Sequence, residues 1–333
     1  MYGAQKAHNL LDWVRLPAPQ PIVSMKKFLL SIIVPVHNEE KNIPLLVERL
    51  TRAVKDYSYE VLFIDDGSTD NTVSILKSYI STNKQLKIFS FTRNFGHQNA
   101  LFCGYQKAKG DCVVSIDADL QDPPEIIPAM IEKWEKGAQI VYARRKKRKD
   151  TLFKKLTAYI FYRVLNILSD VRIPTDVGDF RLLDKTVVSF IKDLSEHNKY
   201  IRGLVSWGGF TWDQVDYNRD ERTAGVTHYT FSKMLNLALD GLTSFSIKPL
   251  RVAMYIGFVT AILGILGITY ALYRRIFLPH EFWITGWTTL FIAVLFMGGI
   301  QLITIGIIGE YIGKTYQESQ NRPPYLLKET INA

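Results

Sequence analysis

The segment SIDADLQDPPE, residues 115–125, contains the side chains best suited to chemistry in this sequence. Asp117 and Asp119 lie two residues apart, so both would point to one face of an extended chain. Two carboxylates held close together repel each other unless a proton or a cation lies between them. A hard divalent cation, Mg²⁺ or Mn²⁺, bound by carboxylates and diphosphate oxygens would remove that repulsion, and Gln121 adds a neutral oxygen. These residues therefore predict a metal–diphosphate site; a polar turn with solvated acids is the alternative.

Short apolar runs alternate with amphipathic stretches around this segment. The apolar runs cover residues 29–36, 59–67, 86–91, 112–120 and 139–145, and the stretches with helical spacing cover 42–54, 72–80, 97–108 and 124–134. This alternation predicts an α/β domain with a parallel sheet covered by helices on both faces. In such sheets ligands bind at the carboxyl ends of the strands.

Polar residues follow four of the expected strands at the point where each ends. They are His37-Asn38-Glu39, Asp65-Asp66-Gly67, Arg93-Asn94 and Asp117-Ala118-Asp119. Because parallel strands end at one edge, we expect these side chains to form a single site. The chain has no P-loop and no convincing G-x-G-x-x-G pattern, so cations from elsewhere must help to hold phosphates. Arg219 and Arg222 are candidates because guanidinium groups match phosphate geometry, and a solvated charged loop is the alternative.

The chain has 333 residues with 41 Lys and Arg against 32 Asp and Glu, a formal net charge of +9. Its average composition excludes a disordered chain, a collagen and an all-membrane transporter. Two long runs nevertheless lack any charge, the 22 residues 252–273 and the 28 residues 282–309. A membrane-spanning helix needs about 20 apolar residues, whereas a buried core helix usually has about 10 to 14. We therefore expect two transmembrane helices after a water-soluble domain.

The two cysteines and the amino-terminal residues add little chemistry. Cys103 and Cys112 lie in no metal-ligand pattern and offer no disulfide framework, which fits a reducing cytosolic domain. Residues 1–24 are interpreted as a flexible extension. Residues 25–36 resemble a signal peptide in part, but the apolar run is short and HNEE ends it, so a buried first strand is the better interpretation.

The ordered motifs of the chain resemble those of the inverting glycosyltransferases of family 2, which have a GT-A fold. The resemblance rests on SIIVPVHNEEKNI, FIDDGSTDNT, TRNFGHQNALFCGYQKAKGD and SIDADLQDPPE, and then on DVGDFRLLD, YIRGLVSWGGF, ERTAGVTHY and LALDGLTSFSIKPLR. The later motifs and the two terminal spans are similar to the polyprenyl-phosphate glycosyltransferases, which include bactoprenol glucosyltransferases and dolichyl-phosphate mannose synthases. The resemblance implies a Rossmann-like, mostly parallel sheet domain followed by interfacial helices and two C-terminal transmembrane helices. The expected divisions are 1–24, a catalytic domain at 25–248, a membrane hairpin at 249–313 and a cytoplasmic tail at 314–333.

The resemblance also implies roles for individual residues. Asp179 matches a catalytic carboxylate near the acceptor, and Asp119 serves both catalysis and metal binding. The donor-binding residues implied are Pro35, His37, Glu39, Asp65, Asp66, Asp117 and Arg222, and the metal ligands implied are Asp117, Asp119 and Gln121. The sequence departs from the family at His37, where relatives often have Tyr, and at Thr227-His228, which replaces a usual Ser-Lys.

A basic and aromatic segment is expected to meet the lipid. Residues 144–149, RRKKRK, are six consecutive cations, and about 150–169 have the character of a helix lying at a membrane interface. No nucleic-acid-binding fold accompanies this patch, so an anionic lipid is the expected partner and nucleic acid is not. Arg144 and Arg163 resemble family positions that hold the acceptor phosphate.

The charges around the two spans predict their orientation. Six cations flank the outer ends of the hairpin and two lie in the connecting loop RRIFLPHE; the six are Lys233, Lys248, Arg251, Lys314, Arg322 and Lys328. The positive-inside rule then places both termini and the catalytic domain in the cytoplasm, at the inner membrane. Because two short anchors often associate, a homo-oligomer is also among the expected partners.

These observations together predict an enzyme that transfers a hexose, glucose by resemblance, from a UDP-sugar to polyprenyl phosphate with inversion. Its expected cofactor is Mg²⁺ or Mn²⁺. Its expected partners are a UDP-sugar, polyprenyl phosphate and the lipid bilayer. Because a phosphomonoester with a second pKa near ~6 is already a nucleophile, Asp179 is expected mainly to orient groups around the acceptor. The alternatives are another donor, such as GDP-mannose or a modified UDP-sugar, a processive polysaccharide synthase, a non-catalytic nucleotide-sugar-binding subunit and a basic membrane scaffold.

Overall fold

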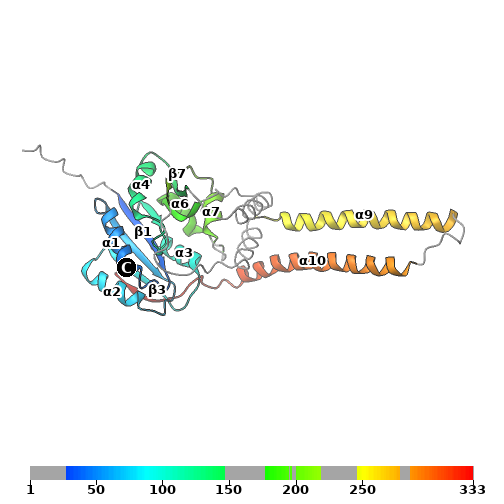
Figure 1. Ribbon diagram of the computed structural model, residues 1–333, viewed down its shortest axis with the longest axis horizontal. Helices are drawn as coiled ribbons and strands as arrows, with labels where there is room; N and C mark the ends of the chain where they lie inside the picture. Colours follow the sequence, from blue (N-terminus) through cyan, green and yellow to red (C-terminus); the bar gives the residue numbers. More distant parts are fainter. Residues whose placement is uncertain are drawn as a thin grey trace, which may run out of the picture.

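The computed structural model describes residues 28–146, 177–194, 196, 200–218, 246–277 and 286–332. A sheet domain lies at one end of the molecule, and two long helices extend away from it side by side (Figure 1). The strands are β1 (Leu29–Val36), β2 (Ser58–Asp65), β3 (Leu86–Phe91), β4 (Cys112–Ser115), β5 (Ile140–Arg145), β6 (Val177–Asp184), β7 (Trp212–Tyr217) and β8 (Leu327–Ile331). The helices are α1 (Ile43–Ala53), α2 (Thr72–Thr82), α3 (His97–Lys107), the 3-10 turn η1 (Pro124–Ile126), α4 (Ile127–Glu135), α6 (Lys185–Asp193), α7 (Ile201–Trp207), α9 (Lys248–Phe277) and α10 (Trp287–Ser319).

The strands form one sheet in the order β7-β5-β6-β4-β1-β2-β3-β8. Strands β4, β1, β2 and β3 run parallel to one another, while β6 is antiparallel to both β4 and β5, and β8 is antiparallel to β3. The mostly parallel sheet expected from the sequence is therefore confirmed. Strand β4 ends at Ser115, five residues earlier than expected, and the chain beyond it adopts a left-handed backbone conformation at Leu120, whose φ is 60°.

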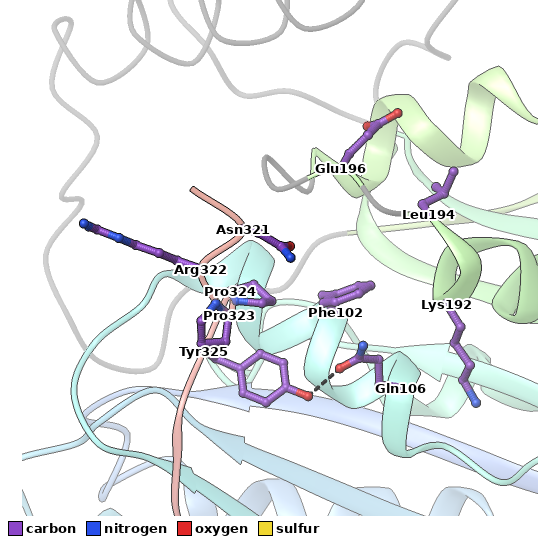
Figure 2. Close-up of a pocket in the computed structure, with 10 residues that line it drawn as sticks. All are labelled: Phe102, Gln106, Lys192, Leu194, Glu196, Asn321, Arg322, Pro323, Pro324 and Tyr325. Atoms are coloured by element: carbon purple, nitrogen blue, oxygen red, sulfur yellow. Dashed lines mark hydrogen bonds between the residues drawn. The ribbon is translucent and has the colours of Figure 1, made fainter. Parts of the chain in front are cut away.

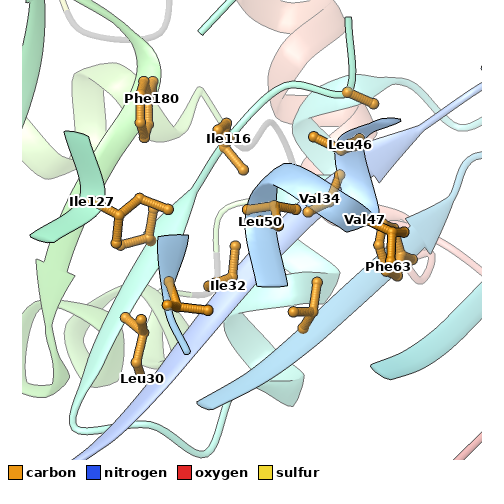
Figure 3. Packing of buried hydrophobic residues seen from close by; sticks show 14 of the residues in the cluster. Leu30, Ile32, Val34, Leu46, Val47, Leu50, Phe63, Ile116, Ile127 and Phe180 are labelled. Carbon is orange, nitrogen blue, oxygen red and sulfur yellow. The ribbon is translucent and has the colours of Figure 1, made fainter. Parts of the chain in front are cut away.

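Helices cover both faces of the sheet, as the alternation of strands and helices predicts. One face packs against α1, α2 and α4, and Figure 3 shows part of this layer, with Leu46 and Leu50 of α1 beside Ile32 and Val34 of β1. The other face packs against α3, α6 and α7. Helix α3 lies so close to β1 that a Cβ on Gly104 would lie 2.2 Å from Cγ2 of Ile33. The close approach packs the second half of α3 directly against β1.

Helices α9 and α10 are the two long apolar helices that the uncharged runs predict. Their stretches Lys248–Tyr273 and Leu290–Ser319 are long and apolar enough to cross a membrane. Their large side chains are almost all exposed, whereas apolar side chains of the sheet domain are buried. An exposed apolar surface of this extent is unfavourable in water and favourable in lipid, so the two helices are consistent with membrane spans.

The chain after α10 returns to the sheet domain. Residues 327–331 fall within the expected tail at 314–333 and form the edge strand β8 beside β3. Lys77 forms an ion pair of 2.8 Å with Glu329, and the Asn332 side chain donates a hydrogen bond of 3.3 Å to the Leu86 carbonyl. A five-residue antiparallel edge strand has too little periodicity to be recognised from sequence.

Candidate active site

The carboxyl ends of β1, β2 and β3 are joined by hydrogen bonds around Asp66. Its amide donates to the Val36 carbonyl at 2.9 Å, and His37 Nδ1 lies 2.9 Å from the Asp66 carbonyl. The buried Asp66 carboxylate accepts from the amides of Phe95 at 2.6 Å and Gly96 at 3.0 Å. Burial raises the pKa of Asp66, and the two amide hydrogen bonds partly offset this. The polar ends of β1, β2 and β3, three of the four that the sequence predicts, thus meet in the structure.

The other residues expected to bind the nucleoside lie at the same edge. Pro35 is in β1 opposite Ile64, and the Asp65 carboxylate accepts from the Ser68 amide at 3.0 Å. The Glu39 carboxylate accepts from the Asn42 side chain at 2.6 Å. Asp65 and Asp66 therefore both bond backbone amides, and their role toward a base stays a prediction.

Acidic side chains gather where the chain leaves β4. Burial raises the pKa of Asp117 to about 6; His97 opposes the shift, and the charges of Asp179, Asp122 and Asp119 add to it. Asp119 accepts a hydrogen bond of 3.2 Å from the Gln121 amide. Asp122 is buried and bonds the Tyr217 hydroxyl. Burial and the neighbouring carboxylates together therefore disfavour the charged form of Asp117, although His97 acts in the opposite direction.

This donor set fits a hard divalent cation in part. Asp117 and Asp119 supply the carboxylate oxygens that Mg²⁺ and Mn²⁺ prefer, and Gln121 lies beside them. Among the described residues, no group of three or more His, Cys, Asp and Glu side chains is arranged to hold a metal ion. A cation at this edge would thus take its remaining ligands from diphosphate oxygens or water, as Mg²⁺ commonly does.

Asp179 lies in an environment of opposite charge. It comes from β6, which pairs with β4, and its backbone carbonyl accepts a hydrogen bond from the Ser115 hydroxyl. Its carboxylate accepts from Arg181 at 2.6 Å and from Arg202 of α7 at 3.1 Å. Burial alone would raise the pKa of Asp179, but Arg202, His97 and Arg181 hold it well below its usual range. Asp179 is therefore a firmly ionised side chain.

His97 connects the two acidic regions, and sequence reasoning did not single it out. Its Nε2 lies 3.6 Å from Oδ1 of Asp117 and 3.5 Å from Oδ2 of Asp179. Removal from water would lower the pKa of His97, but Asp179 and Asp117 raise it to about 9. His97 is the first residue of α3 and follows Gly96, whose φ of 98° favours glycine. The sequence signal that could have identified His97 is its place inside the motif NFGHQ, which is part of the family resemblance.

Arg144 and Arg145 are neighbours on β5 and point to opposite faces of the strand. Arg144, expected to meet the acceptor phosphate, bonds Asp216 through Nε at 2.7 Å and Nη2 at 3.0 Å. Arg145 instead donates to the Tyr217 hydroxyl at 3.0 Å, and its Nη2 lies 3.7 Å from Asp122. Arg145 is thus the arginine of this pair that lies beside the acidic site.

Several predicted features lie outside the described residues. They are the extension 1–24, the basic residues 147–149, the interfacial helix at about 150–169, Arg163, Arg219, Arg222 and Thr227-His228. Their expected roles stay predictions.

Comparison with known proteins places the chain among glycosyltransferases. Residues 31–191 match Glycosyl transferase family 2, and residues 248–315 match the GtrB C-terminal hairpin. The chain is 47% identical over 303 residues to the uncharacterized glycosyltransferase YkcC of Bacillus subtilis, covering 90% of this chain and 93% of that protein. It is 44% identical over 304 residues to the SfII prophage-derived bactoprenol glucosyl transferase of Shigella flexneri, covering 90% and 98%.

Among solved structures, the chain resembles glucosyl-3-phosphoglycerate synthase of Mycobacterium tuberculosis in complex with Mn²⁺ and UDP-Glc. The TM-score is 0.42 and the identity 18%, covering 65% of this chain and 77% of that one.

Proposed function

Because the chain belongs to glycosyl transferase family 2, we propose that it transfers glucose from UDP-glucose to polyprenyl phosphate with inversion. The relative named as a bactoprenol glucosyl transferase supports the acceptor and the sugar, and the matching hairpin supports a reaction at a membrane. The observation that carries the proposal is the position of His97 between two carboxylates, Asp117 and Asp179. The pKa of Asp117 is raised and that of Asp179 is lowered.

The donor half of the site is formed by the ends of β1, β2 and β4. Pro35, His37, Glu39 and Asp65 line the edge where we place the nucleoside, and Asp66 fixes the loop that follows β3. Asp117, Asp119 and Gln121 would hold Mg²⁺ or Mn²⁺ together with the diphosphate. The bound cation supplies Lewis-acid stabilisation of the charge that develops on the departing UDP.

The acceptor half of the site lies toward β5, β6 and α7. A polyprenyl phosphate is largely a dianion at neutral pH, so one of its oxygens can attack the anomeric carbon without a strong base. The new carbon–oxygen bond forms on the face opposite UDP, which leaves with the bonding electron pair. Because its pKa is lowered, Asp179 is a poor proton acceptor, and we assign it the orientation of Arg202 and His97.

Cations near the acidic site would hold the acceptor phosphate. Arg145 lies beside Asp122, and its guanidinium has the fork geometry that suits a phosphate. We propose Arg145 for this role beside Arg163, while Arg144 stays bound to Asp216 until something displaces that carboxylate.

We place the catalytic domain on the cytoplasmic side of the inner membrane. The two apolar helices support membrane association, and the excess of Lys and Arg at the outer ends of the hairpin supports the orientation. Nucleotide sugars are then available to the domain, and the lipid phosphate lies at the leaflet next to it. Association of several copies through the hairpins belongs to the same proposal.

Reconstitution with defined substrates tests the proposal. Purified full-length protein is incubated with Mg²⁺ or Mn²⁺, C55 polyprenyl phosphate and a panel of UDP- and GDP-sugars, with Asp119→Asn as the matched inactive control. We expect a lipid-linked hexose from UDP-glucose, with anomeric configuration opposite to that of the donor. Product from a different sugar nucleotide alone would change the donor, retention would overturn the single displacement, and absence of product with every donor would overturn the function.

A further inference from the structure

The segment that follows the membrane hairpin packs beside the loop that precedes His97. We propose that Tyr325 and β8 are positioning elements of the reaction: they hold the loop 92–96, and through it they place His97 between Asp117 and Asp179. The kinetic part of this inference rests on the proposed function. The structural part, that the C-terminal segment braces the loop, stands on its own contacts.

The first contacts are between the C-terminal segment and the start of the loop. The Thr92 amide donates a hydrogen bond of 3.0 Å to the Leu326 carbonyl, directly beyond the point where β3 and β8 pair. The Tyr325 ring stacks on Phe91, with centroids 4.9 Å apart and planes 12° from parallel. Phe91 in turn meets Phe95 edge to face at 5.8 Å. A chain of three aromatic rings therefore leads from Tyr325 into the loop.

The opposite side of the loop is held by the end of β2. Asp66 accepts from the amides of Phe95 and Gly96, the last two loop residues before His97. A Cβ on Gly67 would lie 2.5 Å from the backbone carbon of Arg93, so the two backbones are in direct contact. The loop is thus clamped between β2 and the C-terminal segment, with little room to shift on the β2 side.

Tyr325 also contacts the helix that His97 begins. Its hydroxyl bonds the Gln106 side chain near the end of α3, and Figure 2 shows this bond with Phe102 of the same helix beside it. Residues 321–325 line an open pocket of about 470 Å³ there, together with residues of α3 and of the end of α6. The C-terminal segment consequently touches both the loop before His97 and the helix after it.

This arrangement ties the membrane hairpin to the reacting groups. Helix α10 ends at Ser319 and β8 begins at Leu327, so only residues 320–326 separate them. Pro323 and Pro324 lie in this linker and restrict its backbone. The short, proline-containing linker 320–326 therefore joins helix α10, which we place in the membrane, to β8, the strand that braces the loop before His97.

Substitutions at Tyr325 test the inference in the full-length protein. Tyr325→Leu removes the stacked ring and the hydroxyl, whereas Tyr325→Phe keeps the ring; Lys77→Ala removes only the ion pair to β8 and is the matched control. Because small displacements of reacting groups are costly, we expect Tyr325→Leu to lower kcat about tenfold or more, with KM for UDP-glucose within about twofold. Tyr325→Phe and Lys77→Ala should stay within about twofold of the wild type.

A double-mutant cycle with His97→Gln separates positioning from general weakening. If Tyr325 acts through His97, Tyr325→Leu should lower kcat much less in the His97→Gln background than in the wild type, because coupled residues are not additive. Equal losses in both backgrounds, or wild-type kcat in Tyr325→Leu, would overturn the positioning role. If Tyr325→Leu does not fold, Tyr325→Met takes its place in the cycle.

Hydrogen–deuterium exchange tests the brace without relying on turnover. Peptides covering 92–100 should exchange faster in Tyr325→Leu than in the wild type, while peptides from β1 stay unchanged and Lys77→Ala matches the wild type. Unchanged exchange at 92–100 would overturn the brace. A wild type that shows this protection but transfers no sugar would instead contradict the proposed function alone.

Discussion

The end of β4 and the middle of β6 are adjacent in the sheet, and each presents a carboxylate to the same site. At the end of β4, Asp117 has mainly acidic neighbours, and burial raises its pKa to about 6. On β6, Asp179 bonds Arg181 and Arg202, and its pKa is held well below the usual range. The protein therefore pairs Asp179 with arginines, whereas at Asp117 burial and acidic neighbours outweigh the effect of His97, so Asp117 would gain from an added cation.

This difference separates two kinds of catalytic work. A carboxylate with acidic neighbours is suited to bind a cation that arrives with the donor, because the cation relieves the repulsion between the negative charges. A carboxylate already paired with two arginines is suited to hold those arginines in place, because its own charge is fully compensated. The following experiments test whether the two carboxylates differ in this way.

The largest effect is expected at the end of β4. Asp119→Asn or Asp117→Asn should lower kcat/KM on the order of 10³-fold, since Lewis-acid stabilisation supplies several kcal/mol and each 1.36 kcal/mol is about tenfold. The measurement is initial rate against Mg²⁺ or Mn²⁺ concentration. Asp111→Asn, at the opposite edge of the sheet, is the control and should keep normal turnover. Activity in Asp117→Asn that needs no more metal than the wild type would contradict the comparison.

A somewhat smaller loss of activity is expected at β6, together with a loss of stability. Asp179→Asn should lower kcat about 10²-fold, and raising the pH should not restore it, because proton removal is secondary. Asp179→Ala should also destabilise the protein by about 3–5 kcal/mol, since it leaves the buried Arg181 without its charge partner. Rates across pH and thermal unfolding measure both effects. Recovery of Asp179→Asn at high pH alone would make Asp179 a general base instead.

The two arginines of β5 extend the comparison to the acceptor. Arg145→Ala should raise KM for polyprenyl phosphate about tenfold, in keeping with about 1.5 kcal/mol for a hydrogen bond to a charged group. Arg144→Ala should change it about twofold or less, because Arg144 already bonds Asp216. Titrations of the lipid at saturating donor compare the two variants. Equal effects would show that both guanidinium groups reach the lipid phosphate.

The smallest effect is a shift of a few degrees in thermal unfolding with pH. The raised pKa of Asp117 means that its contribution to stability is present at low pH and is lost as pH rises from about 4 to 6. Without metal, Asp117→Asn should therefore gain in Tm over the wild type across this range, and added Mg²⁺ should reverse the gain. The lowered pKa of Asp179 has the opposite sign, so the deficit of Asp179→Asn should shrink only below about pH 4. A gain of Asp117→Asn that does not change with pH would contradict the assigned cause.

Regular elements with strong local patterns could be predicted well from the sequence. The runs 29–36 and 86–91 coincide with β1 and β3, the uncharged run 252–273 falls within α9, and residues 287–309 of the second uncharged run lie in α10. Strand β8 could not be predicted, because its five residues become a strand only by pairing with the free edge of β3. Edge strands depend on a distant partner, and single-sequence patterns do not record one.

For the candidate site, the sequence determined which side chains are available, and the fold decided which of them lie together. The spacing of Asp117 and Asp119 after a buried strand predicts an acidic edge, and the two apolar runs predict the membrane hairpin; both depend on local sequence alone. Three contacts depend on how β5, β6, α7 and α3 pack together. They are Arg145 beside Asp122, Asp179 paired with Arg202, and His97 between two carboxylates. Charge interactions act over a few ångströms of space whatever the separation along the chain, so only the tertiary structure could decide them.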